Sequence, residues 1–284
     1  MTAWQFVRAT WTWEPSVALG CLVLAAGYLA VAGSRPARRA VAFFAGIAVL
    51  FLALSSSLDT LGDTYLFSAH MVQHLLLILV VPPLLLLGIP VSLVERVRPV
   101  PWVRRAMAAL GAPAPAWGLG IGTMAVWHVP VLYNAALAHG GVHVAQHLSF
   151  LVTSAIFWWP VLAPAEDARL GPLPAVLYLV TAALASSVVG IIVTFAKVGL
   201  YPAYLLPVDR LGLGPLIRNV WGLSPEIDQE LGGLLMWIPG GLVYLCAILG
   251  VMARWYKTGD PAEPVAPADG DARGPRIVVG TVKG

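Results

Sequence analysis

Residues 66–89 read LFSAHMVQHLLLILVVPPLLLLGI, and this stretch contains no Asp, Glu, Lys or Arg. About 20 consecutive, mostly apolar residues are enough for an α-helix to cross the hydrocarbon core of a bilayer. The stretch is therefore predicted to be a membrane-spanning helix. Its two histidines, His70 and His74, lie near its start, where the surrounding sequence turns apolar.

Six further stretches have the same apolar character. They cover residues 16–33, 39–57, 115–136, 142–163, 173–199 and 230–253. Together with 66–89 they predict an all-α integral membrane protein, in which residues 1–257 form a bundle of seven transmembrane helices. The stretch 173–199 is long enough to be tilted, or broken near Gly190. The connection from about 200 to 229 is expected to cover one mouth of the bundle.

The overall composition supports this fold class. Hydrophobic residues make up 59% of the 284 residues and charged residues only 11%, whereas soluble domains are about 45–50% apolar and about 25% charged. The composition excludes a soluble nucleic-acid-binding protein and a cytosolic enzyme. Residues 258–284 are instead rich in Pro, Gly, Ala and Asp, and they are predicted to be a disordered cytoplasmic tail. Cys21 and Cys246 both lie in apolar runs, so no disulfide framework is expected.

The distribution of basic residues predicts the orientation. The loops after the first, third, fifth and seventh predicted spans carry Arg35, Arg38, Arg39, Arg96, Arg98, Arg104, Arg105, Arg169, Arg254 and Lys257. The opposite loops are mainly acidic. Because Lys and Arg are retained on the cytoplasmic side, the N-terminus is predicted outside and the C-terminus in the cytoplasm.

All six histidines fall in the predicted outer half of the protein. HMVQH (70–74) and HVAQH (143–147) share one pattern, His-x-x-Gln-His. Residues four apart lie on the same face of a helix, so each pair can direct two imidazoles toward one point. Gln73 and Gln146 are expected on the same faces. His139 is interpreted as an incidental loop residue.

Other candidate ligands lie on neighbouring spans. Met124 and His128 repeat the spacing of four, beside Pro130, which is expected to bend or end its helix. Asp228 and Met236 flank Gly232 and Gly233, whose small size favours close helix packing. Imidazole, thioether and carboxylate groups without a thiolate suit copper, and imidazole with carboxylate alone suits zinc. The expected metal ligands are His70, His74, His128, His143, His147, Asp228 and Met236, and no catalytic or cofactor-binding residue is assigned.

Five blocks of the sequence, in this order, resemble one family. They are HMVQHLLL, VPPLLLLGIP, WHVPVLYNAAL, HVAQHLSFLVTSAIFWWPVL and DQELGGLLMWIPGGLVYL. They are similar to the seven-span CtaG-type cytochrome c oxidase assembly factors of bacteria. The resemblance implies a multi-pass protein of the bacterial cell membrane that takes part in maturing a haem–copper oxidase, plausibly by supplying or holding copper.

Three functions remain open at this point. The first is a copper-binding assembly factor or metallochaperone without enzyme activity. Its partners would be a haem–copper oxidase subunit and membrane lipid, with an external copper donor and the oligomeric state left open. The second is a seven-span zinc hydrolase, with Asp63, Asp228 or Glu230 as general base. The third is a copper permease or a haem-associated subunit. A permease should carry polar residues through to the inner face, and the spans below the histidines are almost purely apolar.

Overall fold

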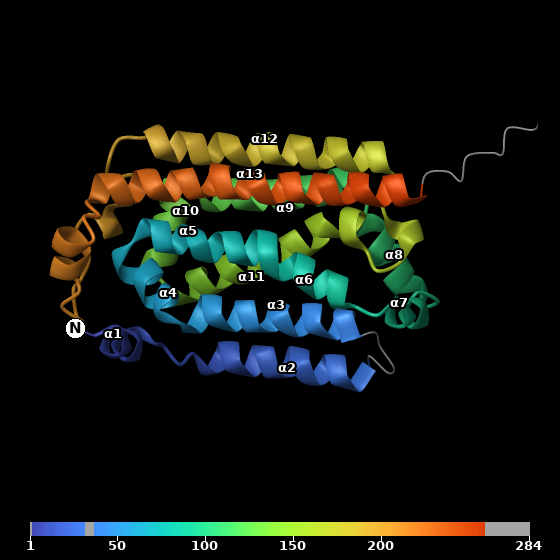
Figure 1. Cartoon of the computed structure of the whole chain (residues 1–284), viewed down its shortest axis with the longest axis horizontal. Coiled ribbons are helices and arrows are strands. Elements are labelled where there is room, and N and C mark those ends of the chain that lie inside the picture. Colours follow the sequence, from blue (N-terminus) through green and yellow to red (C-terminus); the bar gives the residue numbers. More distant parts are fainter. Residues whose placement is uncertain (1, 32–36, 259–284) are drawn as a thin grey trace, which may run out of the picture.

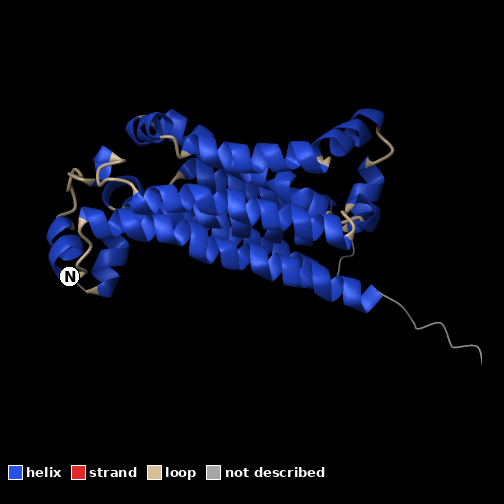
Figure 2. Ribbon diagram, turned by 90° about the horizontal axis from the view of Figure 1, so that it is seen from above, coloured by secondary structure: helices blue, strands red, loops and turns tan. Residues whose placement is uncertain are grey.

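The computed structural model describes residues 2–31 and 37–258. The predicted disordered tail lies outside the described residues, apart from Thr258, which ends the last helix. Within the described ranges the regular structure is helical, without a strand (Figure 2). The prediction of an all-α protein is therefore confirmed for this part of the chain.

Long helices form the body of the protein and run roughly along one direction (Figure 1). They are α2 (Pro15–Val31), α3 (Ala37–Ser55), α5 (Phe67–Leu75), α6 (Val81–Gly88), α9 (Pro113–Trp127), α10 (Pro130–Ala138), α11 (Gly140–Leu162), α12 (Pro172–Phe195) and α13 (Pro225–Thr258). The remaining elements connect them: α1 (Ala3–Thr10), α4 (Ser57–Thr60), η1 (Leu61–Tyr65), η2 (Leu76–Val80), α7 (Val91–Val97), α8 (Pro101–Leu110), η3 (Glu166–Ala168), η4 (Pro202–Tyr204) and η5 (Leu216–Val220).

Each of the seven predicted spans overlaps one or more helices of the described residues. Four helices of the described chain are long and apolar enough to cross a membrane, namely Ala37–Ser55, Phe67–Gly88, Pro172–Phe195 and Pro225–Lys257, and the number rises to six if each of two bent pairs counts as one span. The 23-residue helix α11 is not among them, because its His and Gln side chains reduce its apolar character. The protein thus has the fold of a helical membrane protein, and the count of seven spans and the orientation stay predictions.

Two of the predicted spans differ in detail from expectation. The stretch 115–136 is two helices, α9 and α10, which meet at an angle of 72° beside Pro130, as expected of a residue that cannot continue the helix. The stretch 173–199 is neither broken at Gly190 nor as long as predicted. Helix α12 runs without interruption and ends at Phe195.

Glycines bring α12 and α13 into close contact instead. The two helices lie side by side along their length (Figure 1). A Cβ atom on Gly190 would lie 3.0 Å from the carbonyl oxygen of Gly233 and 3.0 Å from the Cβ of Met236. A Cβ on Gly233 would lie 2.6 Å from the backbone nitrogen of Thr194. The expectation that Gly233 permits close helix packing is confirmed.

A π-helical turn, η2, joins α5 to α6 without ending the helix. Pro82 has no N–H group to offer the carbonyl of Ile78 four residues earlier, and a free carbonyl inside a membrane protein is costly. The indole nitrogen of Trp158 on α11 donates to this carbonyl over 3.0 Å. The segment Phe67–Gly88 therefore stays one long helical unit, with the histidines near its start.

The two ends of the bundle differ in character. Arg39 donates to the carbonyl of Ile89, just after α6, and Arg254 donates to the carbonyl of Val161, near the end of α11. These arginines, with Arg98, Arg104 and Arg169 around the same helix ends, define the arginine end. The start of α5 lies at the opposite end, here called the histidine end. The half nearer the arginines is filled by a buried apolar cluster that includes Leu86, Trp158, Tyr178, Leu179 and Val251.

Substitution of Gly233 by Ala is expected to destabilise the bundle by about 1–3 kcal/mol, because the added methyl group forces α12 away from α13. Gly241→Ala is the matched control on the same helix, since a Cβ there meets nothing within 4 Å. Thermal unfolding of both variants in detergent checks this. Equal stability of the two variants would contradict the packing described for Gly233.

Candidate metal-binding site

Five of the six histidines meet at the histidine end. The ring centroids lie 4.4 Å apart for His70 and His74, and 4.1 Å apart for His143 and His147. Between helices, the centroids of His74 and His147 lie 5.6 Å apart, and those of His74 and His128 lie 5.5 Å apart. The convergence that the paired spacing predicted is therefore present. The sixth histidine, His139, is exposed.

Two groups within this cluster could hold a metal ion. Nitrogen atoms of His70, His74 and His147, all buried, lie within 4.8 Å of one another. Atoms of Asp63, His70 and His143 meet the same limit. Zinc–nitrogen bonds are about 2.0–2.1 Å long, so two nitrogens on one such ion lie at most about 4.2 Å apart. Small side-chain rotations can bring either group within that limit, and His70 belongs to both groups.

Hydrogen bonds determine which ring nitrogen of His70 carries the proton. Its Nδ1 lies 3.3 Å from the carbonyl oxygen of Gly62 and 3.0 Å from the hydroxyl oxygen of Tyr204, which itself donates to Gly62 over 2.7 Å. Because a carbonyl only accepts, and the Tyr204 proton is already used, Nδ1 of His70 is the protonated donor. Its Nε2 then carries the lone pair and accepts a hydrogen bond from Nε2 of His74 over 2.8 Å, which leaves the lone pair of His74 on Nδ1. Metal-binding histidines are commonly held in this way.

His128 has the same arrangement. Its Nδ1 donates to the carbonyl oxygen of Met124 over 2.7 Å, so its Nε2 carries the lone pair. That Nε2 is buried and has no hydrogen-bond partner in the described part of the chain. Nδ1 of His74 and Nε2 of His147 are likewise buried without a partner there. Buried polar atoms without partners are uncommon, because each costs about 1–3 kcal/mol.

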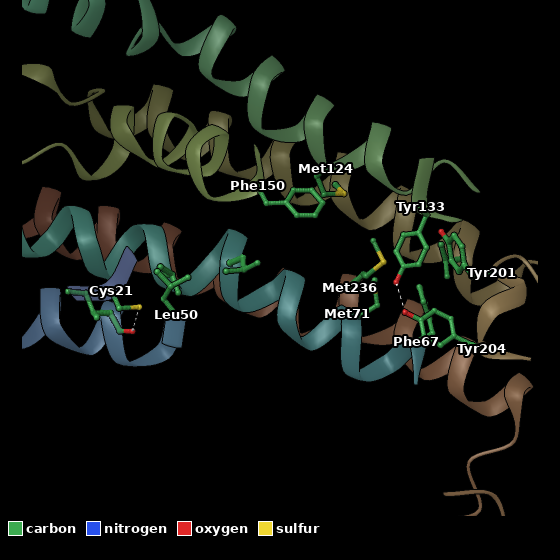
Figure 3. Packing of buried hydrophobic residues seen from close by; sticks show 14 of the residues in the cluster. Cys21, Leu50, Phe67, Met71, Met124, Tyr133, Phe150, Tyr201, Tyr204 and Met236 are labelled. Carbon is green, nitrogen blue, oxygen red and sulfur yellow. Dashed lines mark hydrogen bonds between the residues drawn. The ribbon is translucent and has the colours of Figure 1, made fainter. Parts of the chain in front are cut away.

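Aromatic residues cover the imidazoles. Tyr201 and Tyr204 come from the connection between α12 and α13, and the Tyr201 hydroxyl donates to the carbonyl of His128 over 2.9 Å. Tyr133 on α10 stacks against Tyr201 and has its hydroxyl 3.3 Å from that of Tyr204 (Figure 3). Phe67 completes the packing. Nothing in the spacing of these residues along the sequence indicated this role, which arises only when the loop folds back.

Carboxylates occupy the more exposed side of the site. An oxygen of Asp63 lies 3.5 Å from Nε2 of His143, and Asp59 accepts hydrogen bonds from Thr12 and Gln73. Burial raises the pKa of Asp63 to about 8, and the negative charge of Asp59 adds to this shift. Burial likewise raises the pKa of Asp59 to about 6. A cation bound beside them would favour the ionised carboxylates.

The two glutamines of the paired motifs do not contact the imidazoles through hydrogen bonds. Gln73 donates to the carbonyl of Ala53 and to Asp59, over 2.9 Å in each case. Gln73 therefore ties the first histidine pair to α3 and α4. Gln146 is buried, and neither polar atom of its side chain has a partner among the described residues.

The two predicted ligands on α13 differ in what they contact. Asp228 is buried and accepts hydrogen bonds from the backbone of Phe67 (2.8 Å) and Ser68 (3.0 Å) and from the Ser68 hydroxyl (2.5 Å). It therefore caps the N-terminus of α5, which carries His70 and His74. Met236 lines a cavity that also borders His74 and His128.

Substitution of Asp228 by Ala is expected to lower the stability of the metal-free protein by about 1–3 kcal/mol, because two buried N–H groups lose their acceptor. Glu230→Gln, two residues along α13 and exposed, is the control. Unfolding of metal-free protein in detergent measures the effect. If Asp228→Ala left this stability unchanged and lowered only metal content, Asp228 would be a ligand and not a cap.

Comparison with known proteins adds a family and several relatives. The sequence model of one family, described as cytochrome c oxidase caa3 assembly factor, matches residues 20–258. An uncharacterized protein of Mycobacterium leprae is 25% identical over 272 residues, which is 87% of this chain and 40% of the relative. Uncharacterized proteins of Mycobacterium bovis and Mycobacterium tuberculosis are each 25% identical over 278 residues, covering 88% of this chain. The chain thus spans 40% of the length of these relatives. No solved structure matches it.

Proposed function

The chain belongs to the family of cytochrome c oxidase caa3 assembly factors, and we propose that it serves oxidase assembly by holding a copper ion at His70, His74 and His147. Copper is here the cargo that is passed on to the oxidase. In this proposal the protein is a multi-pass protein of the bacterial cell membrane, and the histidine end faces outward. Its partner is a subunit of a haem–copper oxidase.

One observation carries the proposal. Three imidazoles from two helices, α5 and α11, have nitrogen atoms within 4.8 Å of one another in a buried position. Imidazoles that served only to pack the helices together would be expected to hydrogen-bond across the interface. Here His74 and His147 each keep a buried nitrogen without a partner in the described chain. A bound cation would use these lone pairs and recover the cost of their burial.

The exposed carboxylates supply a route into the site. Asp63 has 37% of its side chain exposed and lies against His143. His70 belongs both to the outer group with Asp63 and His143 and to the inner group with His74 and His147. A metal ion can therefore pass inward by exchange of ligands around His70. At neutral pH Asp59, with a pKa of about 6, is mostly ionised, and its negative charge attracts cations to the mouth.

The position of the carboxylates favours holding over hydrolysis. A zinc hydrolase needs a free carboxylate within about 3 Å of metal-bound water. Both oxygens of Asp228 are engaged by α5, and Glu230 is exposed on α13. Asp63 is the remaining candidate of the three, so the hydrolase alternative depends on this residue. The filled half of the bundle near the arginine end argues against a permease, because side chains such as Trp158 and Leu179 occupy the path.

Removal of the first histidine pair is expected to abolish copper loading. In the double variant His70→Ala, His74→Ala the copper affinity should fall by more than about 100-fold, since even loss of a residue that only orients a ligand costs about 10–100-fold. Elemental analysis of the purified, copper-loaded protein measures the ratio of copper to protein. His139→Ala removes an exposed histidine outside the cluster and serves as the control.

The same variants test the cellular role. A deletion strain should lose oxidase activity. Expression of the wild type or of His139→Ala should restore the activity, whereas expression of the double variant His70→Ala, His74→Ala should not. Partial rescue of the double variant by excess copper would support delivery of the ion. Unchanged copper content in the double variant, or normal oxidase activity in the deletion strain, would overturn the proposal. Loss of a measurable hydrolytic activity in Asp63→Asn would favour the zinc enzyme.

A further inference from the structure

A second group of ligand atoms lies beside the imidazole site. A cavity of about 40 Å³ is bordered by Met71, Met124 and Met236 together with His74 and His128. These are three of only six methionines in the chain. Each comes from a different helix, α5, α9 and α13, so the cluster is a product of the fold and not of one sequence motif.

The cavity continues the site toward the arginine end. His74 borders both the imidazole group and the cavity. Further along α5 and η2 the wall is formed by Leu75 and Ile78, and Tyr244 closes it from α13. Met71 and Met236 lie beside Phe67 and Tyr133 in the close view (Figure 3). An ion at the imidazoles would therefore have to pass only the ring of His74 to reach the cavity.

Filling of the core does not explain this arrangement. Methionine often fills irregular gaps, but here a space remains between the side chains. About 10–15 Å³ is enough to hold one water molecule, so the cavity has room for an ion. In addition, Nε2 of His128 carries a lone pair, because Nδ1 donates to the carbonyl of Met124, and it is buried without a partner in the described ranges.

We propose that Met71, Met124, Met236 and His128 form a second metal position that takes monovalent copper. Thioether sulfur is a soft ligand and selects Cu(I), whereas imidazole accepts Cu(I), Cu(II) and zinc alike. The ligand set thus changes from carboxylate and imidazole at the mouth to thioether and imidazole at depth. The inference rests on the proposed function in one respect: copper reaches the cavity by way of the imidazole site.

The test replaces the three methionines by leucine, which keeps the volume and removes the sulfur. Full-length protein in detergent is loaded with Cu(I) without oxygen, and separately with Zn(II), and X-ray absorption at the copper edge detects sulfur ligands. Wild type should show copper–sulfur scattering. The triple variant should lose it, and its ratio of Cu(I) to protein should fall to about half, while Zn(II) loading stays unchanged. Met252→Leu is the control, because Met252 is exposed and lies on α13, the helix of Met236.

The outcomes separate this inference from the proposed function. Absence of copper–sulfur scattering in wild type, or a full Cu(I) ratio in the triple variant, would overturn the second position and leave the imidazole site intact. Unchanged Zn(II) and copper loading in His70→Ala, His74→Ala would instead overturn the proposed function. If the triple variant also loses Zn(II) binding, the three single Met→Leu variants are compared instead. Each of them should weaken Cu(I) binding more than Zn(II) binding. Equal weakening of both metals would contradict the inference.

Discussion

The carboxylate of Asp228 on α13 accepts hydrogen bonds from the backbone N–H groups of Phe67 and Ser68 and from the Ser68 hydroxyl. These bonds satisfy donors that a helix leaves free at its N-terminus, and they set where α5 begins. His70 follows within the first turn and His74 one turn later, so their position depends on this cap. The close approach of α13 to α5 at Gly232 allows Asp228 to reach α5, because Phe67 occupies the space that a side chain on Gly232 would need.

The candidate ligand atoms change in kind from the exposed side of the histidine end toward the interior. Oxygen and nitrogen atoms meet at the exposed side, in Asp63 and His143; three buried imidazoles follow; and thioethers border the cavity beyond His74. Such an order would suit a protein that receives a cation and holds it, as we propose, and the chain belongs to a family of oxidase assembly factors. The relatives are longer than this chain, which spans 40% of their length.

The features that the sequence predicted are those that depend on local periodicity. Apolar length identified the helices, and spacing of four residues placed each histidine pair on one helix face. The features that it did not predict depend on contacts between distant segments. Tyr204 reaches His70 across 134 positions of the chain, and Asp228 reaches Phe67 across 161. No local pattern marks Asp63 as a neighbour of His143 or groups Met71 with Met236. Sequence reasoning grouped Asp228 and Met236 with the histidine pairs as ligands, and it did not foresee that Asp228 caps α5 or that Met236 borders a cavity with Met71 and Met124.

The position of a bound copper ion can be measured directly. Crystals of the copper-loaded protein, measured at the copper absorption edge, would give the position of copper from its anomalous scattering. We expect a peak between the side chains of His70, His74 and His147. A copper-loaded protein whose peak lay away from these imidazoles, or at exposed residues such as His139 alone, would contradict it.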